Sequence, residues 1–163
     1  MKAAGRKASP EGVIELERRI AAPPAIVFSY FTDPERYRLW QGVDADLDPR
    51  PGGLFRVQMT GRSRHIARGQ YLEVDPPSRL LFTWGWEPAD TLGADQTEVP
   101  PGTSTVEVTL VADGEATIVH LRQSGLPSES TCRFHTWGWD YSLLRLGVLA
   151  PGGDPGPSPF PDL

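Results

Sequence analysis

Residues 130–149 read STCRFHTWGWDYSLLRLGVL, and this stretch decides the fold. Large apolar side chains recur in it at every third or fourth position, which is the periodicity of an amphipathic α-helix. Ser128 is placed to cap the helix, and Glu129 is favourable near the positive end of its dipole. The apolar row consists of Phe134, Trp137, Tyr141, Leu144 and Val148. A row of this length must be buried against another layer, and we expect that layer to be a β-sheet.

The preceding residues supply the strands of such a sheet. Seven stretches rich in β-branched and aromatic residues are separated by turn signals, which is typical of antiparallel strands. Asp113-Gly114 is the strongest hairpin signal among these turns. The expected strands span residues 13–20, 44–48, 54–60, 63–74, 79–86, 103–112 and 116–124.

Two short helices are expected between the first and second of these strands. Pro23 and Pro24 open one helix, because proline is tolerated in a first turn. Asp33-Pro34-Glu35 opens another, with Asp33 as the capping residue. The sequence therefore predicts an α+β fold, in which a curved antiparallel sheet of about six to seven strands wraps around the long C-terminal helix.

Length and composition set the boundaries of this unit. The chain has 163 residues, which suits one domain. Residues 1–12 are small, polar and basic, so we expect a disordered N-terminal arm. Residues 151–163 are rich in glycine and proline, which predicts a disordered tail that forms neither a helix nor a central strand. The folded domain is expected to span residues 13–150.

Charge and residue usage exclude several classes of protein. The net charge of −5 argues against a nucleic-acid partner, which needs a basic surface. A single cysteine, Cys132, excludes an internal disulfide and any multi-cysteine metal site. No apolar run reaches the roughly 18 residues of a membrane span, and the N-terminus lacks the apolar stretch of a signal peptide. We expect a cytoplasmic protein.

An ordered set of short motifs resembles a known family. The set is similar to START-like, helix-grip proteins of the SRPBCC superfamily, and more narrowly to homologues of the C-terminal domain of the heat-shock protein 90 ATPase activator. The motifs are APPAIVF (22–28), TDPERY (32–37), Trp40, RPGGLFR (50–56), GQYLEVDPPSRL (69–80), FTW (82–84), STVEVTL (104–110), GLP (125–127), GWD (138–140) and Leu144.

The resemblance implies a helix-grip fold with an apolar cavity between the sheet and the C-terminal helix. It does not imply one activity, because the superfamily includes lipid carriers, hormone receptors, polyketide aromatase/cyclases and chaperone activators. It supplies no catalytic residues to carry over and no cofactor. An apolar or aromatic small molecule is the expected partner, and a homodimer is a further expectation.

Aromatic side chains are the main candidates for lining such a cavity. Trp84 and Trp86 lie two residues apart on one strand, so they face the same way. Apolar walls with few polar groups are typical of ligand pockets, although the same residues can simply fill a core. The candidate ligand-binding residues are Tyr30, Trp40, Phe55, Met59, Arg68, Phe82, Trp84, His120, Trp137 and Tyr141.

The two polar candidates in this set depend on which sheet face carries them. His120 shares a strand face with Ile118 and Arg122, and could protonate or orient a ligand oxygen if that face were internal. The alternative is a surface histidine. Arg68 belongs to a basic hairpin, and an inward Arg68 would be costly unless it were paired with a carboxylate or an acidic ligand.

Catalytic and metal motifs are weak. Cys132 and His135 are three residues apart on the helix, which gives half a metal site or an incomplete nucleophile–base pair. No nucleophile elbow, phosphate loop, dinucleotide fingerprint or His-Glu-x-x-His motif is present. We therefore expect no metal and no cofactor, and assign no catalytic residue.

Three hypotheses follow. The chain binds an apolar small molecule, or it is a polyketide cyclase or aromatase that acts by holding a flexible substrate, or it is a chaperone-interacting module. A ligand binder needs an apolar cavity, whereas an enzyme needs a polar group that reaches into it. An interaction module would combine a filled interior with an exposed apolar patch.

Overall fold

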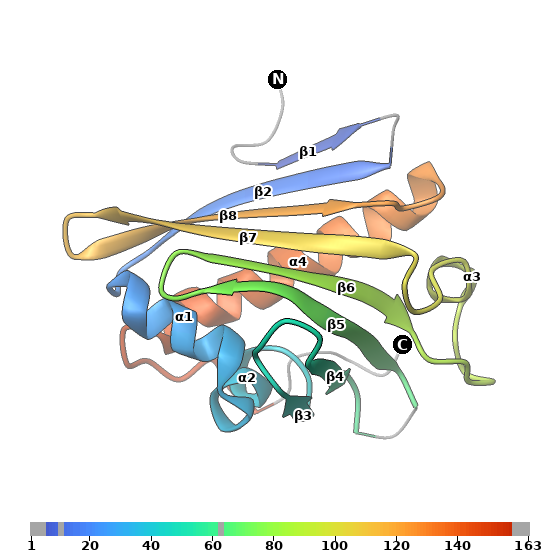
Figure 1. The fold of residues 1–163 in the computed structure, drawn as a ribbon, viewed down its shortest axis with the longest axis horizontal. Coiled ribbons are helices and arrows are strands. Elements are labelled where there is room, and N and C mark those ends of the chain that lie inside the picture. The colour runs from blue at the N-terminus through green and yellow to red at the C-terminus, as the bar shows by residue number, and fades with distance from the viewer. Residues whose placement is uncertain (1–5, 10–11, 62–63, 158–163) are drawn as a thin grey trace.

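A computed structural model describes residues 6–9, 12–61 and 64–157, and it confirms the α+β helix-grip architecture. One antiparallel sheet has the strand order β1-β2-β8-β7-β6-β5-β4-β3. Figure 1 shows the long helix α4 lying along one face of this sheet, and α2 packs against its C-terminal half. The strands are β1 (Arg6–Ser9), β2 (Val13–Ile20), β3 (Asp44–Leu47), β4 (Leu54–Gln58), β5 (Ile66–Asp75), β6 (Arg79–Trp86), β7 (Ser104–Asp113) and β8 (Ala116–Ser124).

Strand β1 corrects the expectation of a wholly disordered arm. It pairs with β2 from Arg6↔Leu16 to Ser9↔Val13, so the described residues contain eight strands rather than six to seven. This pairing satisfies backbone groups along what would otherwise be a free edge of β2. A short strand of small and basic residues leaves no alternating pattern in the sequence. Residues 1–5, 10 and 11 of the expected arm lie outside the described residues.

The helices begin at the positions that the proline and capping residues of the sequence predict. Helix α1 spans Pro24–Thr32, and α2 spans Pro34–Trp40 with the Asp33 side chain accepting a hydrogen bond from Glu35 N at 2.9 Å. Helix α4 spans Glu129–Leu149, and the Ser128 hydroxyl accepts from Thr131 N at 3.1 Å. A fourth, short helix, α3 (Ala94–Thr97), lies between β6 and β7.

The prediction for the apolar row of α4 was wrong. Trp137, Leu144 and Val148 are 43%, 55% and 41% exposed, and Phe134 and Tyr141 are half-buried. The buried face is offset from this row and carries Thr131, Cys132, His135, Trp139, Ser142, Leu143, Arg145 and Leu146. Several of these buried residues are polar and are held by internal hydrogen bonds, so they did not register as an apolar row.

The sheet separates an apolar inner face from a charged outer face. Along β6, Phe82, Trp84 and Trp86 are buried, and Trp84 and Trp86 contact the α4 rings of Trp139 and Phe134. Along β8, Val119 and Leu121 are buried while His120 is exposed. The ring planes of Phe55 and Phe82 stack at 4.4 Å between centroids, in the centre of the core. This alternation fixes which predicted site residues can reach the space below α4.

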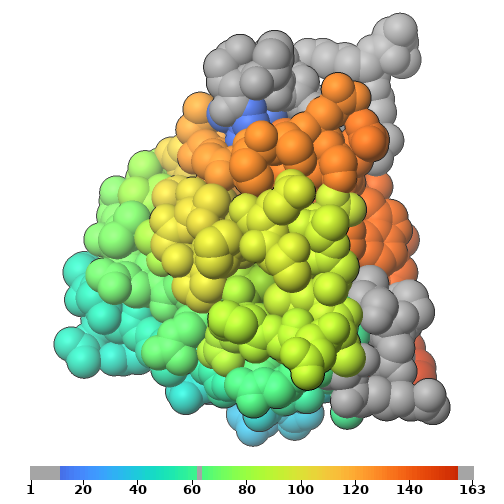
Figure 2. Space-filling model, turned by 90° about the vertical axis from the view of Figure 1, so that its right-hand side faces the viewer, coloured from blue at the N-terminus to red at the C-terminus, as the bar shows by residue number. Residues whose placement is uncertain are grey.

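The segments that flank the core are also packed. Figure 2 shows the segment after β6, in lime, covering the end of the molecule beside the start of α4, in orange. Residues 151–157 form neither helix nor strand, as expected, but Arg145 donates hydrogen bonds to the carbonyls of Pro155 and Gly156, which corrects the expectation of disorder there. Residues 158–163 of the expected tail lie outside the described residues. Over the described ranges, no helix is long and apolar enough to cross a membrane.

Candidate functional site

A small apolar recess lies where α4 meets β6 and the end of β4. Its volume is about 30 Å3, which is room for one or two water molecules. The lining is almost entirely apolar, and most of it comes from β6 and the first half of α4. The lining residues are Gln41, Met59, Trp84, Trp86, Phe134, His135, Trp137, Gly138 and Trp139.

Aromatic rings form the walls of the recess. Trp84 and Trp86, on alternate positions of β6, meet edge to face with centroids 5.7 Å apart. The ring centroids of Trp139 and Trp84 are 5.0 Å apart, and those of Phe134 and Trp86 are 6.4 Å apart. Such contacts favour flat, apolar molecules, because aromatic faces and edges pair with other rings.

Gly138 leaves a gap in the α4 side of the recess. Apart from its chain neighbours and the backbone of its own helix, a Cβ atom built at this position would meet no atom of the described residues within 4 Å. Glycine in the middle of a helix is less stable than alanine by about 1 kcal/mol, and packing inside this chain does not demand it here. The same is true of Gly147, which does not line the recess.

His135 is held as a neutral, fully engaged side chain. Its Nδ1–H donates to the Thr131 carbonyl at 2.8 Å, and its Nε2 accepts from Trp86 Nε1 at 3.1 Å. Burial lowers the pKa of His135 to about 4. Near neutral pH the ring therefore positions Trp86 rather than offering a free acid or base.

Cys132, three residues before His135, offers no reactive pair. Burial raises the pKa of its thiol, which disfavours the thiolate that a nucleophile or a metal ligand requires. Among the described residues, no group of three His, Cys, Asp or Glu side chains could hold a metal ion.

The tryptophan N–H groups around the recess differ in whether they have a hydrogen-bond acceptor. Trp86 donates to His135, and Trp139 donates to Gln123 Oε1 at 2.8 Å. Trp40, deeper in the core, donates to the Tyr30 carbonyl at 2.8 Å. Trp84 Nε1 is sealed from solvent and has no hydrogen-bond acceptor within the described part of the chain. This donor is therefore the unsatisfied polar group of the lining.

The structure brings some of the predicted ligand-binding residues together and separates others. Met59, Trp84 and Trp137 line the recess. Trp40, Phe55 and Phe82 belong to the buried core behind it. Two residues are half-buried beside the core: Tyr141, stacked on Trp137, and Tyr30, which lies under the Arg36 guanidinium.

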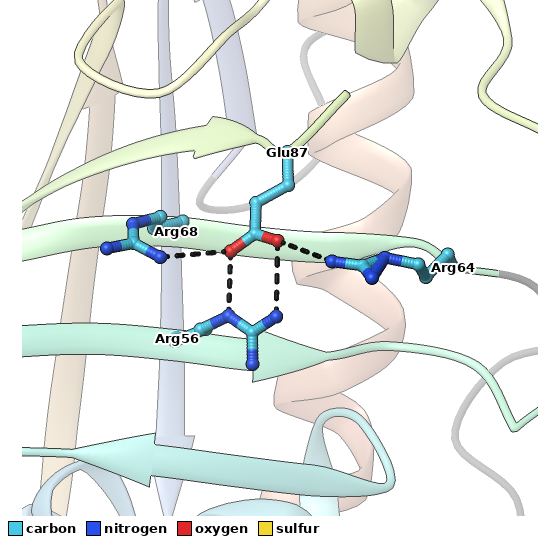
Figure 3. Close-up of polar contacts among 4 residues, drawn as sticks. All are labelled: Arg56, Arg64, Arg68 and Glu87. Carbon is cyan, nitrogen blue, oxygen red and sulfur yellow. Dashed lines mark hydrogen bonds and ion pairs between the residues drawn. The ribbon is translucent and has the colours of Figure 1, made fainter. Parts of the chain in front are cut away.

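The two polar candidates lie on the outer face of the sheet. His120 is half-exposed, and its Nδ1 lies 3.3 Å from Glu17 Oε1. Arg68 joins Arg56 and Arg64 around the carboxylate of Glu87, as Figure 3 shows. Hydrogen bonds from these guanidiniums lower the pKa of Glu87 to about 2. Neither His120 nor Arg68 lines the recess, so we assign no ligand contact to them.

Sequence reasoning missed six lining residues: Gln41, Trp86, Phe134, His135, Gly138 and Trp139. Trp86 could have been found, because it shares a strand face with Trp84. Trp139 and His135 lie on the helix face that the apolar row had hidden. Gly138 and Trp139 belong to the GWD motif of the family resemblance, but nothing in that motif marks them as lining a recess.

A larger hollow of about 410 Å3 opens elsewhere, and its chemistry is different. It is wide and polar, with Arg68, Gln70 and Thr83 among glycine and proline residues. These side chains belong to the outer face of the sheet. The hollow does not match the apolar ligand expected for a helix-grip protein, so the recess below α4 is the candidate site.

Comparison with known proteins agrees with the fold. No curated protein matches the sequence. An AHSA1-like protein from Rhizobium etli is 44% identical, with a TM-score of 0.69 over 95% of this chain and 92% of its own. CalU16 from Micromonospora echinospora is 29% identical, with a TM-score of 0.65 over 91% of this chain and 83% of its own. DynU16, from the dynemicin biosynthetic locus, is 26% identical, with a TM-score of 0.73 over 90% of this chain and 49% of its own.

A family model matches a continuous region that includes every described helix and most of the sheet. The match covers residues 21–150, which contain α1 to α4 and strands β3 to β8. It therefore includes every residue that lines the recess. This chain belongs to the family of Activator of Hsp90 ATPase homolog 1-like proteins.

Proposed function

We propose that this chain binds a small, flat, apolar molecule between β6 and α4. The observation that carries the proposal is the recess itself, walled by Trp84, Trp86, Phe134 and Trp139. A cluster of aromatic side chains with few polar groups is the usual composition of a small-molecule pocket. The likeness to DynU16, from the dynemicin biosynthetic locus, supports a small molecule as the ligand.

The size of the recess sets a condition on binding. Its volume is about 30 Å3, whereas an engineered apolar cavity that holds benzene measures roughly 150 Å3. An aromatic ligand therefore enters only if side chains at the rim rotate outward. Trp137 is 43% exposed and Phe134 is half-buried, so these two residues can move without opening the core.

The cyclase alternative receives less support from this geometry. A general acid or base would have to reach the ligand. His135 is the one ionisable side chain in the lining, and both of its ring nitrogens are engaged. The proposal therefore assigns binding and no reaction.

Substitution of Gly138 by leucine tests the site. The introduced leucine side chain would enter the recess, while a helix with leucine in place of glycine is intrinsically more stable. Native mass spectrometry of gently purified protein should show a co-purifying small molecule in the wild type and lose it in Gly138→Leu. Added indane, an apolar bicyclic probe, should bind the wild type and bind Gly138→Leu at least tenfold more weakly.

Gly147→Leu is the matched control, because Gly147 lies on the same helix with open space at its Cβ and does not line the recess. It should bind indane as the wild type does. Equal binding by both variants would show that the probe binds elsewhere, and no binding of either indane or its ketone analogue 1-indanone by the wild type at millimolar concentration would overturn the proposal.

A second candidate function, protein binding, is favoured by the exposed row on α4. Trp137, Leu144 and Val148 are exposed along one side of the helix, and apolar patches of this kind often mark protein contacts. The family name points to heat-shock protein 90 as the partner to test. In this case the chain would raise the chaperone's ATPase rate.

Leu144→Glu tests this candidate against Val111→Glu, an equally exposed apolar position on the sheet. Chaperone ATPase stimulation should be lost with Leu144→Glu and kept with Val111→Glu. Sedimentation of both variants would also detect a homodimer formed through α4. A wild-type chain that leaves the ATPase rate unchanged and sediments as a monomer would exclude this function.

A further inference from the structure

The unsatisfied N–H of Trp84 carries information about the ligand. Trp84 is 2% exposed, and no hydrogen-bond acceptor for its Nε1 is found in the described residues. Buried polar groups in native proteins are nearly always paired, because leaving one without a partner destabilises the folded state. Trp86 and Trp139, its neighbours in the same lining, both have an acceptor inside the chain.

The other buried polar side chains of the lining are engaged, and Trp137 is 43% exposed to solvent. His135 uses both ring nitrogens, as described above. The Gln41 amide accepts from the Tyr37 hydroxyl at 2.5 Å and donates to the Ser142 hydroxyl at 3.1 Å. The group left over is therefore a donor, so what the recess lacks is a hydrogen-bond acceptor.

We propose that the ligand carries an acceptor oxygen, such as a ketone, quinone or aryl ether oxygen, on a flat apolar skeleton, and that Trp84 Nε1 donates to it. This inference rests on the proposed function and specifies the ligand class of the same site. It predicts discrimination, because an analogue without the oxygen leaves the indole N–H unpaired.

Two probes of nearly the same shape test the inference. Indane and 1-indanone share a bicyclic skeleton and differ in one carbonyl oxygen. We expect 1-indanone to bind the wild-type chain several-fold to about tenfold more tightly than indane, which is the usual range for one neutral hydrogen bond. In a ¹H–¹⁵N spectrum, the indole N–H signal of Trp84 should shift downfield with 1-indanone and much less with indane.

Substitutions identify the donor. Trp84→Phe keeps an aromatic ring without the N–H, so the two probes should bind it with equal affinity, and the loss of one indole signal assigns Trp84. Trp40→Phe is the control, because the Trp40 N–H already donates to the Tyr30 carbonyl and Trp40 does not line the recess; the preference for 1-indanone should persist in this variant. The wild-type spectrum gives an independent reading if Trp84→Phe does not fold.

The outcomes separate the two proposals. Equal affinity of both probes for the wild type, with no shift of the Trp84 signal, would overturn the acceptor requirement and leave the binding site standing. The Trp84 N–H would then interact weakly with an aromatic ring face, such as that of Trp86, whose ring centroid lies 5.7 Å from the centroid of Trp84. Failure of both probes to bind would overturn the proposed function and this inference together.

Discussion

The two faces of the sheet treat polar groups in opposite ways. On the inner face most polar side chains are neutral and held by one particular partner, as Trp139 is by Gln123 and Trp86 is by His135; Arg18, which pairs with Asp140, is an exception. On the outer face charged side chains form shared ion pairs, as three arginines share Glu87. The difference follows from solvent access, because charge is expensive in the dry interior and cheap at the surface.

This contrast determines where function can reside. An unpaired group on the outer face can be hydrated, so it implies nothing about a ligand. An unpaired group on the inner face is costly, and Trp84 Nε1 is such a group. We expect the hydrogen bonds of the inner face to contribute more to the free energy of unfolding than the ion pairs of the outer face do.

The largest effect is expected from breaking an inner partnership. Trp139→Phe removes the donor to Gln123 Oε1, and Gln123 is fully buried. We expect a loss of about 3 kcal/mol in the free energy of unfolding, from lost volume and from an unpaired buried acceptor. Urea denaturation would measure it.

Trp84→Phe is the matched control for Trp139→Phe. It removes a similar volume in the same lining but leaves no acceptor unpaired, so it should lose roughly 1–2 kcal/mol. Equal losses in the two variants would show that the hydrogen bond to Gln123 contributes little and would weaken the contrast between the faces.

The second effect is a dependence on pH. Burial lowers the pKa of His135 to about 4, from an ordinary value of 6.5. Between these pH values the unfolded chain binds a proton that the folded chain does not, so stability falls as pH is lowered from 6.5 to 4. At about 1.4 kcal/mol per pKa unit, the loss is on the order of 3 kcal/mol.

His135→Gln should flatten this part of the stability profile, which chemical denaturation at a series of pH values would record. A slope that is unchanged in the variant would assign the titration to another group. Above pH 7 the His135 contribution should not vary with pH, since the ring is neutral in both states.

The fold was largely predictable from the sequence, and its main error is instructive. Capping residues placed the starts of α2 and α4, and turn dipeptides separated the strands. The rotation of α4 was not predictable, because its outward row is more apolar than its buried face. The buried face carries His135 and Ser142, whose polar atoms find partners only in the folded chain. Hydrophobic periodicity predicts that such polar residues are exposed, but they are buried here because internal hydrogen bonds satisfy their polar atoms.

The candidate site was less predictable for a similar reason. Strand alternation identified Trp84 correctly as inward, and it would have identified Trp86 as well. For His120 and Arg68, alternation shows which residues share a strand face but not which face is internal. A charged residue does not decide the question, because an inward arginine can be paired: Arg18 lies on the inner face of β2 and contacts Asp140 on α4. The recess depends on Gly138, and although GWD (138–140) is one of the motifs of the family resemblance, that motif does not reveal that Gly138 lines a recess.

A smaller effect is expected for the outer cluster. Glu87→Gln removes the carboxylate that Arg56, Arg64 and Arg68 share, and should cost about 1 kcal/mol at low salt and less at high salt. Since the pKa of Glu87 is lowered to about 2, its contribution is complete above pH 4.5 and is lost as pH falls toward 2. Glu35→Gln, at an exposed pair with Arg38, is the control and should change stability by less than Glu87→Gln does.

The smallest effect is expected at His120. The side chains of His120 and Glu17 are about half exposed and lie 3.3 Å apart, so water competes for both. His120→Ala should change the free energy of unfolding by less than about 0.5 kcal/mol and should leave indane binding at the wild-type affinity. A melting curve of the variant would check the change in stability, and calorimetric titration with indane would check the binding affinity. Loss of binding in His120→Ala would mean that the outer face takes part in recognition, and the division of labour between the two faces would then be wrong.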